Sequence, residues 1–396
     1  MNVLVTCHSY YPNNDGVQFV TQYLCEGLAK KGHVVTVVTN YYKNREMSNK
    51  ETHNGVSIIR INAKTVHKIH TGDKNGYIKL IKQLVDQNDV MVNVCTQCAT
   101  TDWLLSELKS IEIPKVLYMH SIWDFRYSKE DLSSIKKLIS KMWGNIIWRP
   151  YYFFNKKNFK EYDIVTQLHE KDYTTDFFKK KYGIDSVIIE NAAEDAFFDE
   201  AINDEIKLPK KYIINVSNFQ KRKNQMKCLE LFLNDNTPEG WSLILVGSRE
   251  TDYSVAIENK YKEFKKRNPS STKDVRMLYG VPRADISTYV KKASLYMMTS
   301  KWEAFPISLI ECMAAEVPFI SSNVGIVKYL SGGIVCKNDA EYLHWMRAFM
   351  TDDKLRKKYG ELGGSEARER YTISNKTDKL ENILIKIMER NNERNK

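Results

Sequence analysis

Two glutamates in the second half of the chain have a spacing that suits recognition of a phosphorylated ligand. Glu303 lies in a predicted loop, and Glu311 lies eight positions later, inside the helix that follows. Pro306 suits the first turn of that helix, because proline has no N–H to leave unsatisfied there. The next amides then point outward with the positive end of the helix dipole behind them, which predicts a phosphate site. These amides belong to Ile307, Ser308 and Leu309.

A basic loop gives the two glutamates a context. Tyr212–Val216 is a β-prone run, and the polar segment after it contains Arg222 and Lys223, whose side chains suit a diphosphate. Gly247 follows another strand, Trp241–Val246, and a glycine there permits close approach of a ligand. Each feature also has an ordinary explanation: a helix cap, a surface carboxylate or solvated lysines. Together they predict an anion site at the ends of these strands.

The order of apolar runs predicts a doubly wound α/β fold. A strand, a polar turn, a helix and a second strand follow one another within the first forty residues. Continuous apolar strands that alternate with helices are typical of parallel sheets covered on both faces. The strands predicted in the first half are Met1–Thr6, Val34–Thr39, Val90–Val94, Lys115–Met119, Ile164–Thr166 and Val187–Ile189. Those in the second half are Tyr212–Val216, Trp241–Val246, Val275–Leu278, Ser294–Met298, Val317–Ile320 and Ile334–Val335.

A polar, acidic stretch between the two series of strands divides the chain. We expect one Rossmann-like domain at 1–194, a second at 195–374 and a final helix at 375–396. Ligands of such sheets bind beyond the carboxyl ends of the strands, so we expect the site in a cleft between the domains. The final helix needs a docking surface, because its apolar residues form one stripe. They are Leu380, Ile383, Leu384, Ile387 and Met388.

The composition excludes several classes of protein. Apolar residues make up 42% of the 396 residues, and no run approaches the roughly 20 apolar residues of a membrane-spanning helix. The N-terminus does not resemble a signal peptide, so we expect a cytoplasmic protein. The seven cysteines agree, because they are scattered through apolar runs as reduced thiols are. Cys95 and Cys98 have the spacing of metal ligands, but no second pair accompanies them.

Basic residues outnumber acidic residues 60 to 49, which gives a net charge of +11. Such an excess favours acidic partners. The sequence contains no recognisable motif of a nucleic-acid-binding domain, so we expect no nucleic-acid partner. The segment 136–160 carries seven basic residues and no acidic one, interleaved with aromatic residues. This mixture suits an anionic membrane surface. An ordinary core helix with lysines on its solvated face is the alternative.

The chain resembles the retaining glycosyltransferases of family 4, which have the GT-B fold. The resemblance covers nearly the whole chain and is strongest from Tyr212 to Cys336. A glutamate, seven residues and a second glutamate form the family's signature, matched here by Glu303 and Glu311. In the family, the first contacts the donor sugar and the second the ribose hydroxyls. Lys223 inherits the family's diphosphate contact. The resemblance also implies that the last helix returns to the first domain.

The resemblance implies further site residues. His120, after the strand 116–119, matches a histidine that family members place against the transferred sugar, and it joins Glu303 and Lys223 as an implied catalytic residue. A structural role is the alternative for a histidine at a strand end. The family's arginine is Asn218 here, so we expect Arg222 to supply the second cation. The implied donor-binding residues are Gly16, Asn218, Arg222, Lys223, Gly247, Val281, Phe305, Pro306, Ile307, Ser308 and Glu311.

The function that the resemblance implies is transfer of a sugar, with retention of configuration, from a nucleotide-sugar to a hydroxyl of a glycan or lipid-linked acceptor. UDP is favoured over GDP, and cell-surface polysaccharide or glycolipid biosynthesis is the implied setting. The chain has no Asp-x-Asp motif. We therefore expect no metal and no cofactor besides the nucleotide-sugar. The absence of Gly-x-Gly-x-x-Gly after the first strand weakens a dinucleotide oxidoreductase. The alternative is a catalytically silent GT-B subunit that binds a partner.

Overall fold

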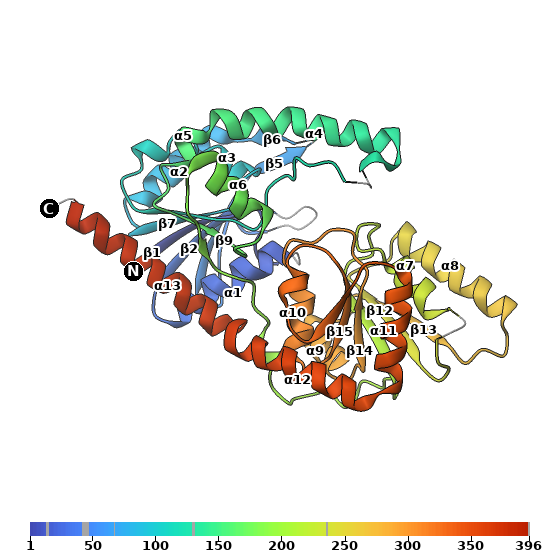
Figure 1. Ribbon diagram of the computed structural model, residues 1–396. Coiled ribbons are helices and arrows are strands. Elements are labelled where there is room, and N and C mark those ends of the chain that lie inside the picture. The colour runs from blue at the N-terminus through green and yellow to red at the C-terminus, as the bar shows by residue number, and fades with distance from the viewer. Residues whose placement is uncertain (13–15, 42–46, 67, 129–130, 235–236, 395–396) are drawn as a thin grey trace. The chain divides into compact units, whose positions relative to one another are not determined.

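The computed structural model describes residues 1–12, 16–41, 47–66, 68–128, 131–234 and 237–394. The chain divides into two compact units: unit 1 comprises Met1–Glu190 with Lys376–Lys396, and unit 2 comprises Asn191–Asn375. Each unit has its own largely parallel sheet with helices packed around it (Figure 1). This is the doubly wound α/β class that the alternation of strands and helices predicts.

The strands of the main sheet in unit 1 are β1 (Asn2–Thr6), β2 (Val34–Asn40), β3 (Lys50–His53), β4 (Val56–Ile61), β7 (Val90–Val94), β8 (Lys115–Tyr118), β9 (Ile164–Gln167) and β10 (Val187–Ile188). Within the described residues their order is β10-β9-β8-β7-β1-β2-β4-β3. Neighbouring strands are parallel except β3 and β4. Every residue of β7 and β8 is buried, since helices cover both faces, and this explains their continuous apolar sequences.

Four strands of unit 1 were missed by the sequence prediction. They are β3, β4 and the antiparallel pair β5 (Ala63–Val66) and β6 (Ile69–Gly72). No residue of β3 is fully buried, and three of the four residues of β5 are exposed. Strands that face water on one side need no continuous apolar run. β3, β5 and β6 therefore lack the signal that marks the central strands, whereas four of the six residues of β4 are apolar and that strand was simply overlooked.

The helices of unit 1 are α1 (Gly16–Lys30), α2 (Lys74–Val85), α3 (Ala99–Asp102), α4 (Ile135–Phe154), α5 (Lys156–Phe159) and α6 (Tyr173–Tyr182), with the 3₁₀ turns η1 (Leu108–Ser110) and η2 (Asp131–Ser133). The apolar side of α1 is buried at Val20, Leu24 and Leu28. Gly183 ends α6 with a φ of 68°, which glycine adopts at little cost. Among the described residues, no helix is long and apolar enough to cross a membrane.

The strands of unit 2 are β11 (Tyr212–Val216), β12 (Ser242–Gly247), β13 (Asp274–Tyr279), β14 (Leu295–Met298), β15 (Phe319–Ser322) and β16 (Gly333–Cys336). They pair in the order β13-β12-β11-β14-β15-β16, and every pair is parallel. The helices are α7 (Gln225–Phe232), α8 (Asp252–Arg267), α9 (Arg283–Lys291), α10 (Ile307–Ala314), α11 (Asp339–Thr351) and α12 (Asp353–Arg370), with η3 (Asp195–Phe197) and η4 (Val327–Tyr329). The direction of winding therefore reverses between β11 and β14.

Helix α13 (Ile373–Arg394) begins at the end of unit 2 and returns the chain to unit 1. Lys31, which follows α1, contacts Asp378 at 2.6 Å and Glu381 at 2.7 Å. Lys376 and Glu190, both buried, form an ion pair at 2.8 Å. The members of the predicted apolar stripe that are fully buried are Leu380, Leu384 and Ile387. The expected return of the last helix to the first domain is thus confirmed.

The buried pair of Lys376 and Glu190 predicts a large effect of one substitution. Lys376→Met should lower the free energy of unfolding by about 3 kcal/mol, because it leaves the buried Glu190 carboxylate without its close cation. Lys379, which is more exposed and 3.8 Å from Glu190, is a weak substitute and its Met variant is the matched control. Urea unfolding followed by circular dichroism measures both. Equal stability of the two variants would show that the ion pair of Lys376 with Glu190 contributes no more than the exposed Lys379 does.

Candidate functional site

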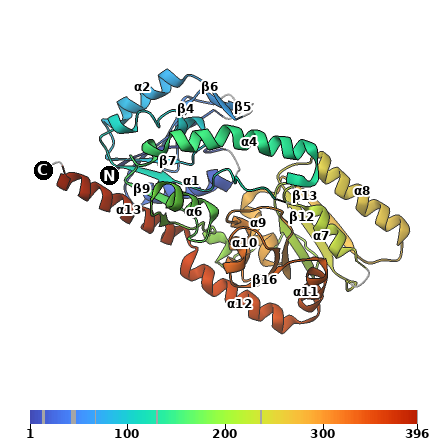
Figure 2. The same cartoon turned by 45° about the horizontal axis from the view of Figure 1, so that its top comes forward.

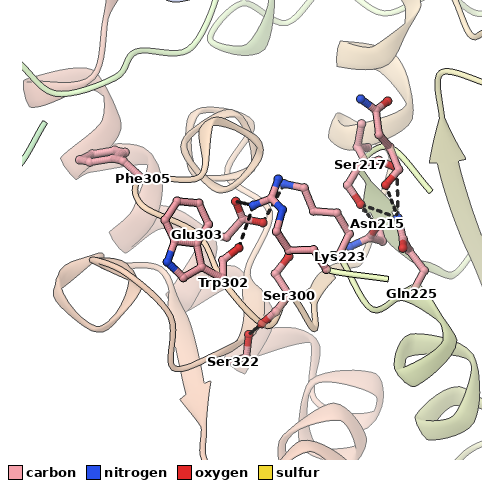
Figure 3. A network of polar contacts seen from close by, with 12 residues as sticks. Asn215, Ser217, Lys223, Gln225, Ser300, Trp302, Glu303, Phe305 and Ser322 are labelled. Atoms are coloured by element: carbon pink, nitrogen blue, oxygen red, sulfur yellow. Dashed lines mark hydrogen bonds and ion pairs between the residues drawn. The ribbon is translucent and has the colours of Figure 1, made fainter. Parts of the chain in front are cut away.

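The loops that follow β11 and β14 carry the two central charges of the predicted site. Lys223 lies after β11, and Glu303 lies between β14 and α10. Both loops leave the carboxyl edge of one parallel sheet at the point where the strand order reverses, and loops at such a point face each other. Lys223 Nζ lies 2.7 Å from Glu303 Oε1, and the Glu303 side chain is buried (Figure 3). The structure therefore brings together the cation and the carboxylate that the sequence predicts.

Arg222 adds a second cation to this pair. Its Nη1 donates to the Trp302 carbonyl oxygen at 2.9 Å and lies 3.5 Å from Glu303 Oε2. Its guanidinium lies 5.5 Å from the centre of the Trp302 ring, within the range of a cation–π contact. The backbone N–H of Lys301 also donates to the Arg222 carbonyl oxygen at 2.8 Å. Two cations thus share one carboxylate in a cluster formed by Arg222, Lys223 and Glu303.

Hydrogen bonds beneath this cluster hold the loop after β11 in shape. Gln225 Nε2 donates to the carbonyl oxygens of Ser217 at 3.2 Å and Asn218 at 3.0 Å. Ser217 Oγ in turn donates to Asn215 Oδ1 at 2.7 Å (Figure 3). Asn224 turns the chain into α7 with a φ of 57°, a conformation that asparagine tolerates better than most residues. The Asn218 side chain is exposed on this loop.

The start of α10 differs in one respect from the sequence prediction. Pro306 is the residue before the helix, and the helix begins at Ile307. Leu309 N–H donates to the Pro306 carbonyl oxygen at 3.1 Å, so the prediction of three outward amides was wrong for Leu309. A short turn of this kind commonly satisfies one amide of a first helical turn. The amides of Ile307 and Ser308 precede it, where the helix itself supplies no acceptor.

Two predicted donor-binding residues also have structural roles. A Cβ at Gly247 would clash with the ring of Phe219, so glycine is required there for packing. Phe305 is buried, with its ring centre 5.9 Å from that of Tyr371. Its carbonyl oxygen accepts a hydrogen bond from Asn191 Nδ2 at 2.9 Å. Contact of either residue with a donor stays a prediction.

Glu311 is buried on α10 and forms an ion pair with Arg283. Arg283 begins α9, directly after the segment 280–282 that contains the half-buried Val281, and its Nε donates to Glu194 Oε1 at 2.8 Å. Burial raises the pKa of Glu311 and the charge of Arg283 lowers it, with a raised pKa as the result. Arg283 and Glu194 were not among the site residues predicted from the sequence. The available signal was the position of Arg283, two residues after the predicted donor-binding residue Val281.

The two predicted residues of unit 1 follow strands β1 and β8. Gly16 is the exposed first residue of α1, and residues 13–15 of its loop lie outside the described residues. His120 is buried, and its Nε2 has no hydrogen-bond partner within the described part of the chain. Burial lowers the pKa of His120 to about 4, so its imidazole is neutral at pH 7. A neutral imidazole can donate one hydrogen bond and accept another.

Comparison with known proteins identifies the segment that contains Lys223, Glu303 and Glu311. Residues 198–364 match the family described as glycosyl transferases group 1. The match lies within unit 2 and includes both loops of the Lys223 and Glu303 pair. The resemblance drawn from the sequence is confirmed at this level, and membership of family 4 stays a prediction.

Solved structures that resemble the whole chain share its fold. Sucrose-phosphate synthase of Thermosynechococcus elongatus aligns with a TM-score of 0.71 at 13% identity over 98% of both chains. A glycosyltransferase of Rickettsia africae ESF-5 aligns with a TM-score of 0.70 at 14% identity, again over 98% of both. HepE of Anabaena, in complex with UDP and glucose, aligns with a TM-score of 0.67 at 14% identity over 98% of this chain and 100% of HepE. The predicted GT-B fold is thus confirmed.

The two cysteines with metal-ligand spacing are not part of a larger cluster of metal-ligating side chains in the described part of the chain. Among the described residues, no group of three His, Cys, Asp or Glu side chains is arranged to hold a metal ion. Cys98, one of the two cysteines with metal-ligand spacing, is buried, and burial raises the pKa of its thiol to about 11. A thiol with so high a pKa stays protonated at pH 7 when no metal ion is bound.

The lowered pKa of His120 predicts how the stability of the protein depends on pH. The unfolded chain binds the proton first, because its histidine pKa is near 6.5 while that of the folded protein is about 4. The stability linked to His120 is present above pH 6.5 and is lost as pH falls toward 4, by up to about 3 kcal/mol. His120→Gln should remove this part of the pH dependence. Urea unfolding of both proteins between pH 7 and pH 4 tests it, and parallel stability curves would count against a buried neutral His120.

Proposed function

We propose that the protein is a retaining glycosyltransferase of family 4 that transfers a sugar from a UDP-sugar to a hydroxyl of a glycan or lipid-linked acceptor. The ion pair of Lys223 with Glu303 is the observation that carries the proposal. It lies at the strand-order reversal, inside the segment that matches the group 1 glycosyl transferases. The similar fold of HepE, whose structure contains UDP and glucose, supports a UDP-sugar donor.

The cluster of Arg222, Lys223 and Glu303 accounts for donor binding by an exchange of partners. A nucleoside diphosphate carries more negative charge than one carboxylate, and it competes with Glu303 for the two cations. When the diphosphate takes Lys223 and Arg222, the Glu303 carboxylate is released toward the sugar that is attached to the diphosphate. The amides of Ile307 and Ser308 supply further donors to the phosphate. In this proposal side chains and backbone, and no metal ion, stabilise the leaving diphosphate.

Retention follows in this proposal from attack on the same face that the diphosphate leaves. The bond between the anomeric carbon and the phosphate oxygen breaks, and the acceptor oxygen forms the new bond to that carbon. The proton of the acceptor hydroxyl passes to the departing phosphate oxygen, so no covalent enzyme intermediate is needed. His120 is proposed to contact the transferred sugar as a neutral imidazole, and Gly16 to let the backbone of unit 1 approach the donor.

The setting proposed for the reaction is cytoplasmic, in the synthesis of a cell-surface polysaccharide or glycolipid. All seven cysteines lie within the described residues as thiols, which suits a reducing compartment. Calorimetry with UDP, GDP and their sugars tests the donor. Release of UDP in the presence of acceptor tests turnover. A chain that binds UDP-sugars but never releases UDP with any glycan or lipid-linked acceptor would instead fit a catalytically silent subunit.

Removal of the Lys223 cation should weaken donor binding. We expect Lys223→Ala to reduce UDP affinity by about 1.5–3 kcal/mol, the usual contribution of a hydrogen bond to a charged group. Lys221→Ala is the matched control, because Lys221 is an exposed lysine two positions earlier in the same loop. Calorimetric titration with UDP measures both variants. The placement of the diphosphate is wrong if a folded Lys223→Ala variant binds UDP as the parent does.

Neutralisation of Glu303 should separate donor binding from catalysis. Glu303→Gln is expected to abolish sugar transfer, because the carboxylate assigned to the sugar is lost. UDP affinity should stay the same or rise, since the carboxylate no longer competes with the diphosphate for Lys223 and Arg222. Initial rates and calorimetry on one preparation measure both properties. A fall in UDP affinity as large as that of Lys223→Ala would oppose the exchange of partners.

A further inference from the structure

Helix α4 of unit 1 exposes large apolar side chains along its length. In both views of the chain α4 lies on the outside of unit 1 (Figures 1 and 2). A protein surface ordinarily carries such residues singly, and a contiguous exposed patch marks an interaction site. The exposed fractions are Ile135 78%, Ile139 60%, Met142 46%, Trp143 54%, Ile146 61%, Phe153 75% and Phe154 76%. We call these seven residues the α4 stripe.

The α4 stripe lies opposite the side of the helix that is already packed. At about 100° per residue, its members fall within a sector roughly 120° wide. The buried positions of the helix, Gly144, Asn145, Trp148 and Tyr152, fall in a sector centred on the other side. The alternative of an ordinary core helix therefore accounts for only one side of α4. Of the aromatic residues, Trp148 and Tyr152 belong to the core, and Trp143, Phe153 and Phe154 do not.

Contacts on the packed side prevent α4 from turning its stripe inward. A Cβ at Gly144 would clash with the ring of Trp123, so these two residues meet without space between them. Trp123 Nε1 donates to Asn145 Oδ1 at 2.8 Å. Near the other end of the helix, the hydroxyls of Tyr152 and Thr96 form a buried hydrogen bond of 2.7 Å. The stripe is therefore held on the solvent side by the fold of unit 1.

Basic residues border the α4 stripe. The segment 136–160 has no acidic residue. On the adjoining loop, Asp124 pairs with Arg126 at 2.8 Å, and Asp131 lies 3.9 Å from Lys141. A second copy of the chain would bring like charges together at this surface, which disfavours self-association. The exposed basic residues of the segment are Lys136, Lys137, Arg149, Lys156, Lys157 and Lys160.

We propose that the α4 stripe docks on an anionic lipid bilayer, with its apolar side chains at the boundary of headgroups and acyl chains and the bordering cations among the lipid phosphates. Helices with one apolar and one basic side bind membranes in this orientation. Only the benefit of membrane binding rests on the proposed function: a lipid-linked acceptor stays in the bilayer, so an enzyme that uses it must bind there. The binding itself requires neither donor nor acceptor.

Vesicle binding by the full chain alone tests the proposal. Co-sedimentation with phosphatidylcholine vesicles should rise by about tenfold or more when roughly a third of the lipid is phosphatidylglycerol, because the surface then attracts the cations. Binding should fall when salt is raised from about 0.05 M to about 0.5 M, since salt screens that attraction. A chain that ignores anionic vesicles at low salt overturns the proposal, whether or not it transfers sugar. A chain that binds them but transfers no sugar refutes the proposed function and leaves the docking surface in place.

Two matched double variants assign the binding to the stripe. Ile139→Glu with Ile146→Glu should reduce affinity for anionic vesicles by about tenfold or more, because two carboxylates enter the membrane-facing side. Leu362→Glu with Ile385→Glu is the control, because both are exposed aliphatic residues on other helices and the added charge is equal. It should lose much less affinity. Equal losses in the two variants would mean that net charge alone governs binding, and this result overturns the proposal.

Trp143 reports directly on insertion of the stripe. Its emission should shift to shorter wavelength and be quenched by brominated lipids when anionic vesicles are added, and Trp143→Phe should lose most of this change. Sedimentation equilibrium tests whether a second copy of the chain binds the α4 stripe instead. The proposal is overturned if the parent chain forms a dimer that the Ile139→Glu, Ile146→Glu variant does not form, and if vesicles leave the emission of Trp143 unchanged. The α4 stripe would then be a surface for self-association.

Discussion

The reversal of strand order between β11 and β14 is the constraint on which the site in unit 2 depends. It brings the loop that ends at α7 against the loop that ends at α10, so a lysine and a glutamate 80 positions apart form an ion pair. Arg222 contacts Trp302, and Gln225 at the start of α7 donates to Ser217 in the loop after β11. These contacts hold both loops at that edge. Without the reversal the two charges would lie on separate parts of the sheet edge, and neither would be shielded from water by the other's loop.

Paired charges explain how this edge tolerates buried ionisable groups. Glu303 is balanced by Lys223 and Arg222, while Glu311 shares Arg283 with Glu194. A buried carboxylate is costly unless a cation stands beside it, so each glutamate of the family signature has one. In both pairs the carboxylate is buried and the cation is partly exposed, with Lys223 20% exposed beside Glu303 and Arg283 32% exposed beside Glu311.

Two helices of unit 1 show that apolar periodicity alone does not tell what a helix packs against. The stripe of α13 is buried, and ion pairs with Lys31 reinforce its attachment. The stripe of α4 is exposed, because Gly144, Asn145 and Tyr152 use the other side of that helix for the core. Both sequences repeat apolar residues at helical spacing. The difference lies in small and polar residues whose partners, such as Trp123 and Thr96, are distant in the chain.

The sequence by itself determined the central strands, the doubly wound class and the identities of Lys223, Arg222, Glu303 and Glu311, because buried parallel strands leave continuous apolar runs and the signature has a set spacing. It did not determine β3, β5 and β6, whose exposed residues carry no such signal, nor the internal use of the Leu309 amide. Only the tertiary structure decided that Glu303 pairs with Lys223, that Arg283 joins Glu311, and that the α4 stripe faces solvent. Each of these depends on residues brought together by strand order and helix packing, which local sequence does not encode.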